Sequence, residues 1–358
     1  MDLDQVRSNA RRVVAYAREH DLGWRPHVKT HKSLAIGAIQ LEAGARGLTV
    51  ATLREAEVMA ELTDDLLLAY PQLGPARRGR LARLVADGVR MKVALDSAEA
   101  LDEAAAAGGE GDGEVEVLVE LDVGMGRVGV QGPEEAVALA ARAARAGGVR
   151  YGGILFYPGH IRVPAREQPP LLEDVSRRLG AVLEALEAAD LAPPIVSGGS
   201  TPTLWQSHLI PGLTEIRPGT AIFHDRDMVE LGVCDIGEVA YHILATVVST
   251  AVSGRAVVDA GSKALAREEF RAGGKGYGLL PDHPEVPLIS LSEEHGVLDL
   301  SGSSWRPRVG DRVRIIPNHV CVSVNLQDRL LARDGQGYRP VPLEGRGRLE
   351  AGAQSRHS

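Results

Sequence analysis

The sequence predicts an α/β protein in which a (β/α)₈ barrel is followed by a smaller β-rich domain. Its 358 residues are too many for one small domain and fit a barrel with an added domain. Over the first two thirds, short apolar segments alternate with segments that have the composition and the apolar spacing of helices. Beyond residue 227, segments rich in Val, Thr and Ile are separated by Gly, Pro and Asp turns, which is typical of a β domain.

About eight β/α units can be counted in the barrel region. Two strands are expected near 24–29 and 214–223. The other six are apolar runs of strand length at 47–51, 66–70, 91–95, 115–121, 152–157 and 195–197. Helices are expected at 75–87, 97–107, 134–146 and 171–189. An open doubly wound sheet has the same alternation, but no GxGxxG motif follows the first strand, which favours the barrel.

The predicted domain boundaries follow from these patterns. We expect the barrel at 1–226 and the β-rich domain at 227–343, with strands near 238–251, 255–260, 297–300 and 312–316. Residues 344–358 are polar and Gly-rich, and we expect them to form a disordered tail.

Composition and charge exclude several classes of protein. Acidic residues outnumber basic ones by 48 to 40, for a net charge of −8, which argues against a nucleic-acid partner. The two cysteines, Cys234 and Cys321, provide no disulfide framework. No apolar run approaches the roughly 20 residues that span a bilayer, and the first dozen residues lack the apolar core of a signal peptide. The chain is therefore predicted to be soluble and cytoplasmic, with no membrane partner.

A lysine flanked by histidines ends the first predicted strand, in the sequence RPHVKTHK at 25–32. On an extended strand, His27, Lys29 and His31 share one face. Burial and nearby cationic groups would keep part of the Lys29 amine neutral and ready to form a Schiff base. The alternative is a surface lysine whose apolar stem packs on the protein while its charge stays in water.

Two Gly-rich loops follow the last two predicted barrel strands, SGGSTPT at 197–203 and RPGT at 217–220. Barrels of this kind commonly bind a phosphate group there, because glycines let backbone N–H groups approach an anion and hydroxyls add donors. The alternative is a pair of tight turns, since Gly, Ser and Pro all favour turns.

Two further segments carry chemically useful side chains. Arg127 lies in the Gly-rich loop LDVGMGRVGV after a strand, where its guanidinium can hold an acceptor oxygen or pair with Asp122. In PNHVC, His319 and Cys321 are two residues apart, so that on a strand both face the same side. Imidazole and thiolate together suit zinc, although an isolated His-x-Cys is usually part of a core. Cys234 has no such neighbour and is expected to be buried.

Taken together, these segments resemble a known family. RPHVKTHK, ELDVGMGRVGV, SGGST, EIRPGT followed by FHD, DAGSKAL, EEHG and PNHVC occur in the order expected of D-threonine aldolase and D-serine dehydratase-like enzymes. These are fold-type III pyridoxal-phosphate (PLP) proteins related to alanine racemase, and the resemblance covers about 12–331. It implies a barrel that holds PLP, a β domain that closes over it, a divalent metal (zinc or manganese) and a homodimer.

The resemblance also implies roles for individual residues. Lys29 would be linked to PLP as a Schiff base, Arg127 would contact the cofactor ring or its phenolic oxygen, and Thr52 would lie near the ring. Tyr157, in FYPGH, would be close to both cofactor and substrate and take part in catalysis. The phosphate would be bound by Gly199, Ser200, Gly219 and Thr220, and the metal by His319 and Cys321.

The implied activity is that of a lyase acting on a D-configured β-hydroxy amino acid. Retro-aldol cleavage to glycine and an aldehyde, as in D-threonine aldolase, is our first expectation. β-Elimination from D-serine or 3-hydroxyaspartate is the alternative, because Cys321 matches the His-x-Cys of the dehydratases whereas the aldolases more often show His-x-Asp. VNLQDRL and SEEHGV are more similar to the aldolases. A racemase or a non-catalytic PLP carrier fits the metal pair and the β domain less well.

Two points stay open at the level of sequence. Four histidines, namely His27, His31, His160 and His295, lie near the predicted functional loops without an assigned role. Family members usually begin with an extra strand, and MDLDQV corresponds to a point partway along it, so we expect either an alternative start or a β domain with one strand fewer.

Overall fold

The computed structural model describes residues 1–268, 270, 275–335 and 337–347. These form two compact units. The barrel unit comprises Arg11–Ile161, Arg166–Gly219 and the described residues from Glu344 onward, and the β unit comprises Met1–Ala10, Arg162–Ala165 and Thr220–Leu343. None of the helices in the described ranges combines the length and apolar character needed to cross a membrane.

The barrel unit is built on an eight-stranded parallel sheet within the described residues, in the order β1-β8-β7-β6-β5-β4-β3-β2. An isolated parallel bridge between His27 and Thr49 joins the chain after β1 to β2, so the sheet curls round on itself. The strands are β1 (Gly23–Trp24), β2 (Leu48–Val50), β3 (Asp65–Leu68), β4 (Arg90–Leu95), β5 (Val115–Leu121), β6 (Val149–Phe156), β7 (Ile195–Gly198) and β8 (Glu215–Ile216). The predicted barrel is confirmed.

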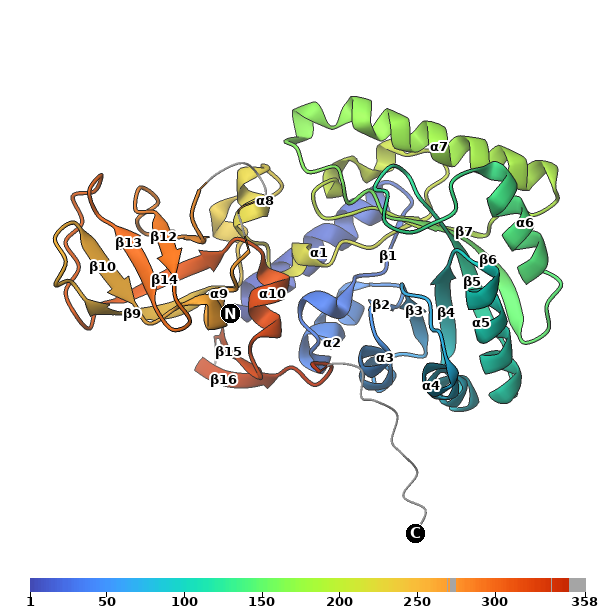
Figure 1. The fold of residues 1–358 in the computed structure, drawn as a ribbon, viewed down its shortest axis with the longest axis horizontal. Helices are drawn as coiled ribbons and strands as arrows, with labels where there is room; N and C mark the ends of the chain where they lie inside the picture. Colours follow the sequence, from blue (N-terminus) through green and yellow to red (C-terminus); the bar gives the residue numbers. More distant parts are fainter. Residues whose placement is uncertain (269, 271–274, 336, 348–358) are drawn as a thin grey trace, which may run out of the picture. The chain divides into compact units, whose positions relative to one another are not determined.

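Helices lie outside these strands (Figure 1). The apolar positions of the longest show why: Leu172, Val175, Leu179, Val182 and Leu186 recur every three or four residues and are all buried. The helices are α1 (Leu3–Glu19), α2 (Leu34–Ala43), α3 (Leu53–Met59), α4 (Pro75–Ala86), α5 (Ala98–Glu110), α6 (Pro133–Ala143) and α7 (Pro169–Ala188), with 3₁₀ turns η1 (Val28–Thr30), η2 (Ala165–Glu167) and η3 (Leu204–Leu209). Helix α4 packs on α5, and α6 on α7.

A buried charged network ties the strands of the barrel together. Arg25, which is 3% exposed, donates to Glu215 at 3.0 Å and to Asp65 at 2.6 Å. Lys92 donates to the same Asp65 at 2.7 Å, and Ser197 donates to Glu215 at 2.7 Å. Buried charges persist only when they are paired in this way, so the network fixes the relative positions of β1, β3, β4, β7 and β8.

The β unit has an antiparallel sheet of six strands within its described residues, in the order β11-β14-β9-β10-β13-β12. Its core includes Val247, Val258, Leu288, Leu298 and Ile315, all fully buried. The strands are β9 (Ile243–Ser249), β10 (Arg255–Val258), β11 (Gly278–Leu279), β12 (Leu288–Leu291), β13 (Gly296–Asp299) and β14 (Arg312–Pro317), followed by a hairpin of β15 (Arg329–Asp334) and β16 (Gly337–Pro342). The short helical elements are η4 (Thr220–Ile222), α8 (Arg226–Glu230), η5 (Ile236–Glu238), α9 (Ser262–Leu265) and α10 (Val320–Asn325). The predicted β-rich character is confirmed.

The predicted tail begins in contact with the barrel unit. The Glu344 carboxylate accepts a hydrogen bond from the Leu34 N–H at 3.1 Å, and the Gly345 N–H donates to the Lys32 carbonyl at 2.8 Å. Residues 348–358 of the expected tail lie outside the described residues. The boundaries expected at 226/227 and 343/344 stay predictions.

Candidate functional site

The segment that carries Lys29 is a turn rather than a strand. Strand β1 ends at Trp24, and Val28–Thr30 form the 3₁₀ turn η1, with the His31 N–H donating to the Val28 carbonyl at 3.0 Å. The expected extended strand with three side chains on one face is therefore wrong, because helical dihedrals turn successive side chains to different sides. Of the two interpretations left open for Lys29, the exposed side chain agrees with the surface lysine, and the link of Lys29 to PLP stays a prediction.

The two histidines of this segment differ in their surroundings. His31 is fully buried and bonded through Nε2 to Gln40 Oε1 at 3.1 Å, and burial lowers its pKa to about 4. Burial, together with the charges of Lys29 and Arg217, holds the pKa of His27 well below its ordinary value. Both rings are neutral at pH 7, and His31 is part of the core.

Lys29, Arg127 and Tyr157 converge in the barrel unit. The Lys29 ammonium lies 6.0 Å from the centroid of the Tyr157 ring, and the Arg127 guanidinium lies 5.1 Å from the same centroid. A Cβ atom at Gly159 would lie 2.1 Å from Tyr157 Cε1. The glycine of FYPGH is therefore required for the ring to occupy this place, and the structure brings together three residues that the sequence predicted for the site.

Asp122 shapes the loop that presents Arg127. Its Oδ1 accepts hydrogen bonds from the backbone N–H groups of Gly124, Met125 and Gly126 at 3.0, 2.8 and 3.1 Å. Burial alone would raise the pKa of Asp122, but the three N–H donors outweigh burial, and the pKa lies below its ordinary value. Asp122 thus holds the backbone of the loop.

The predicted phosphate-binding residues of the barrel unit lie in tight turns. Gly199 has φ +81°, and Ser200 is 4% exposed, with its hydroxyl 3.0 Å from that of Thr203. A Cβ atom at Gly219 would lie 2.4 Å from the His27 carbonyl oxygen. Gly219 therefore has no room for a side chain, and Gly199 has a left-handed conformation that favours glycine. The turns provide backbone N–H and hydroxyl donors, so they fit a phosphate group.

Thr52 already has a structural task at the end of β2. It is the N-cap of α3, where its side chain accepts a hydrogen bond from the Glu55 N–H at 3.1 Å. The cap fixes the hydroxyl at the start of the helix. Thr52 is thus a structural residue in this structure, and its place near a cofactor ring stays a prediction.

In the β unit, His319 and Cys321 lie at the start of a helix rather than on a strand. Strand β14 ends at Pro317, His319 is the N-cap of α10, and Cys321 falls in its first turn. The expected strand geometry is wrong, because the chain leaves the sheet after Pro317 and turns into α10. His319 Nδ1 lies 3.0 Å from Asp225 Oδ2, and Cys321 Sγ lies 3.6 Å from Thr220 Oγ1.

The charges around His319 suit a cation. Burial acts to lower the pKa of His319, but interactions with Cys321 and Asp225 outweigh it and raise the pKa to about 11. Within the described residues, no group of three or more His, Cys, Asp or Glu side chains has the arrangement of a metal site. An imidazole and a thiol in a negative environment fit a divalent metal that takes its other ligands from water or substrate.

Two further residues, one in each unit, were not singled out from the sequence. Asp225 was quoted in FHD without a role, and it is fully buried against His319. Arg217, in EIRPGT, donates to Ser197 Oγ and the Phe156 carbonyl at 2.7 Å each, and burial lowers its pKa to about 10. Each stands in a motif, but a single sequence does not reveal which members of a motif are buried.

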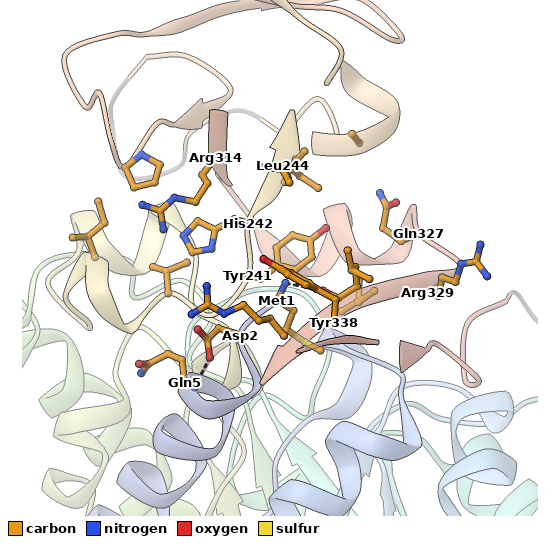
Figure 2. Close-up of a pocket in the computed structure, with 18 of the residues that line it drawn as sticks. Met1, Asp2, Gln5, Tyr241, His242, Leu244, Arg314, Gln327, Arg329 and Tyr338 are labelled. Carbon is orange, nitrogen blue, oxygen red and sulfur yellow. Dashed lines mark hydrogen bonds between the residues drawn. The ribbon is translucent and has the colours of Figure 1, made fainter. Parts of the chain in front are cut away.

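A separate groove of about 810 Å³ lies in the β unit (Figure 2). Met1 and Asp2 line it together with Tyr241, His242 and Tyr338. Burial and nearby cations lower the pKa of His242 to about 4. None of the predicted site residues lines this groove, so it plays no part in the candidate site.

Two family models match the chain. The model for the N-terminal domain of alanine racemase matches residues 1–227, and that for a putative serine dehydratase domain matches residues 240–332. The chain is also 36% identical to D-threo-3-hydroxyaspartate dehydratase of Delftia sp. (strain HT23) over 344 residues, which cover 90% of each chain. The chain belongs to the D-threonine aldolase and D-serine dehydratase-like family. The family and the alanine racemase-like fold predicted from the motifs are confirmed.

Solved structures of family members agree with this placement. D-threonine aldolase from Filomicrobium marinum superposes with a TM-score of 0.88 at 29% identity, covering 97% of this chain and 94% of that one. A cysteine-to-alanine variant of D-threo-3-hydroxyaspartate dehydratase, described as being in the metal-free form, gives 0.85 at 33% identity and covers 96% and 95%. In a second variant of that family enzyme, alanine replaces a histidine two positions before this cysteine. Aldolases and dehydratases are both lyases.

Proposed function

We propose that this protein is a PLP- and divalent-metal-dependent lyase that acts on D-β-hydroxy amino acids by retro-aldol cleavage, as D-threonine aldolase does. The observation that carries the lyase assignment is the His319–Cys321 pair in its negative environment, because both cleavage next to a β-hydroxyl and loss of that hydroxyl benefit from a metal, whereas racemisation does not. In the related dehydratase, the histidine and the cysteine that were replaced by alanine are also two positions apart. This agreement supports His319 and Cys321 as metal ligands.

The predicted cofactor residues would hold PLP. Lys29 would attach it covalently, Arg127 and Tyr157 would face its ring together with Thr52, and the phosphate would be bound by Gly199, Ser200, Gly219 and Thr220. When bound, PLP withdraws electron density from Cα of the substrate, and the protein determines which bond breaks.

The reaction requires two proton movements that this chain must supply. The Cα–Cβ bond breaks, the β-hydroxyl loses its proton, and Cα gains one, which yields glycine and an aldehyde. The Lys29 amine and the Tyr157 phenol are the proton carriers near one another, and neither His27 nor His31 is protonated at pH 7. Lys29 is exposed and therefore free to move between partners.

The second candidate is β-elimination, in which Cα loses a proton and the β-hydroxyl leaves as water; a water molecule then hydrolyses the imine of the product, giving a 2-oxo acid and ammonia. Cys321 favours it, because it matches the His-x-Cys of the dehydratases, whereas the aldolases more often show His-x-Asp. The similarity to the Delftia protein, a D-threo-3-hydroxyaspartate dehydratase, also supports elimination.

Product analysis with D-threo-3-hydroxyaspartate separates the two reactions on one substrate. The purified protein would be supplied with PLP and either zinc or manganese. Glycine and glyoxylate are expected, together with glycine and acetaldehyde from D-threonine. Oxaloacetate and ammonia would establish the dehydratase instead, and no turnover of either substrate by the PLP-loaded protein would overturn the proposal. A Cys321→Asp variant is the matched test, since it is expected to raise the share of aldol products.

We also propose that the protein acts on small D-amino acids as a homodimer in the cytoplasm. The related enzymes support the substrate class. Light scattering after gel filtration tests the dimer, and a single-chain mass near 38.1 kDa at working concentration would contradict it.

A further inference from the structure

We propose that Asp225 is a positioning residue for the metal: it binds Nδ1 of His319 and thereby leaves Nε2 as the atom that ligates. The inference rests on the proposed function in one respect, namely that a divalent metal binds at His319 and Cys321. It adds a third residue, which touches neither metal nor substrate and acts through the histidine.

The contacts of Asp225 reach three parts of the β unit. Its Oδ2 lies 3.0 Å from His319 Nδ1 and accepts a hydrogen bond from the Val320 N–H at 3.0 Å. Its Oδ1 accepts from the Met228 N–H at 3.1 Å, at the N-cap of α8. One carboxylate therefore holds the ring of the histidine, the backbone that follows it and the start of a neighbouring helix.

The burial of Asp225 makes these contacts obligatory. The side chain is fully buried, and a buried carboxylate is stable only when donors surround it. The His319 ring must therefore present an N–H at Nδ1, which places the lone pair of the neutral ring on Nε2. Carboxylate partners of this kind orient metal-binding histidines and increase the basicity of the ligating nitrogen.

The local chain shows how Asp225 reaches this place. The turn η4 begins at Thr220, and the Phe223 and His224 N–H groups both donate to the Thr220 carbonyl. His224 then adopts φ +53°, an unusual conformation for a non-glycine residue, which turns the chain into the N-cap position. Because Thr220 also lies 3.6 Å from Cys321 Sγ, this single turn contacts both predicted ligands.

A purely structural role as the cap of α8 is the competing explanation. Asn and Asp are about equally good N-caps, so Asp225→Asn keeps the cap and the shape and removes the charge that faces His319. The control is Asp235→Asn. Asp235 caps η5 in the same unit and makes no contact with His319 or Cys321.

The experiment measures zinc binding to the full-length chain by competition with a chromophoric chelator, with no activity assay. We expect Asp225→Asn to weaken zinc binding about tenfold or more, with an unchanged thermal midpoint in the metal-free protein. Asp235→Asn should leave zinc binding unchanged. In a His319→Ala background Asp225→Asn should cause no further loss of zinc affinity.

The outcomes separate the positioning role from the proposed function. If the wild type binds zinc through His319 and Cys321 and Asp225→Asn binds it equally well, the positioning role is wrong and the lyase proposal stands. If Asp225→Asn lowers the thermal midpoint but not zinc affinity, Asp225 is only a cap. If alanine at His319 or Cys321 leaves zinc binding unchanged, the metal site itself is wrong.

Discussion

The segments that carry Lys29 and His319 gave the same prediction from sequence, namely a strand. They differ in how tightly their functional side chains are held. Both were expected to be strands, and both are turns that lead into short helical elements. Within the described ranges, the Lys29 ammonium makes no hydrogen bond or ion pair, and its side chain is exposed. His319 is 20% exposed at its side chain and fixed by the buried Asp225.

The difference follows from what each residue is proposed to do. A lysine that is linked to a cofactor and also moves protons must change partners during the reaction, so fixed contacts would oppose it. A metal ligand gains from being held in its binding geometry before the metal arrives, because less order is then lost on binding. In the barrel unit the Lys29 side chain is exposed, and in the β unit His319 is held by Asp225.

Removing the Lys29 amine should have the largest effect on activity. Lys29→Ala is expected to lower lyase activity by at least about 10³-fold, while PLP still binds without a covalent link. Lys32→Ala is the matched control, since Lys32 pairs with buried Glu55 at 3.5 Å, outside the predicted site. It should lower stability and keep the activity. Steady-state kinetics and the spectrum of bound PLP provide the measurements, and full activity in Lys29→Ala would end the assignment.

Removing either proposed metal ligand should abolish zinc binding and leave PLP binding unchanged. His319→Ala and Cys321→Ala are each expected to reduce bound zinc, measured by elemental analysis after dialysis, to near zero per chain. PLP content, measured on the same samples, should not change. Cys234→Ala is the control, because this other cysteine is buried and is not a predicted ligand. Wild-type zinc content in both ligand variants would contradict the assignment of the pair.

Protonation of a core histidine should affect folding rather than metal binding. The pKa of His31 is about 4 in the folded protein and about 6.5 in an unfolded chain. The unfolded chain therefore binds the proton more readily, and stability is lost as pH falls from about 6.5 toward 4. His31 should account for a loss of about 2 kcal/mol between pH 7 and pH 5.

Urea denaturation of the wild type and of His31→Gln at these two pH values tests this. The free energy of unfolding of the variant should depend less on pH by about that amount. Parallel losses in the two proteins would show that other groups, such as His242, cause the acid sensitivity.

Adding one methyl group to the turn at Gly219, which is proposed to bind the phosphate, should have the smallest effect. Gly219→Ala would place a Cβ atom 2.4 Å from the His27 carbonyl. We expect it to weaken PLP binding about tenfold, measured by titration of the PLP-free protein. Gly180→Ala in helix α7 has nothing within 4 Å, so it should leave PLP binding alone and stabilise the helix by roughly 0.5–1 kcal/mol. Equal PLP affinity in the two variants would mean that the turn at Gly219 does not bind the cofactor.

The sequence by itself determined the fold class, because strand and helix periodicity are local and recur along the whole barrel. It also predicted most residues of the candidate site, because Gly, Lys, His and Cys in motifs indicate the chemistry that each can perform, and their roles stay predictions. Only the tertiary structure decided that Lys29 is exposed, that His31 belongs to the core and that Asp225 lies behind His319. Burial and partners depend on segments far apart in the chain. Asp225 and His319 are separated by 94 positions, and no local pattern encodes their contact.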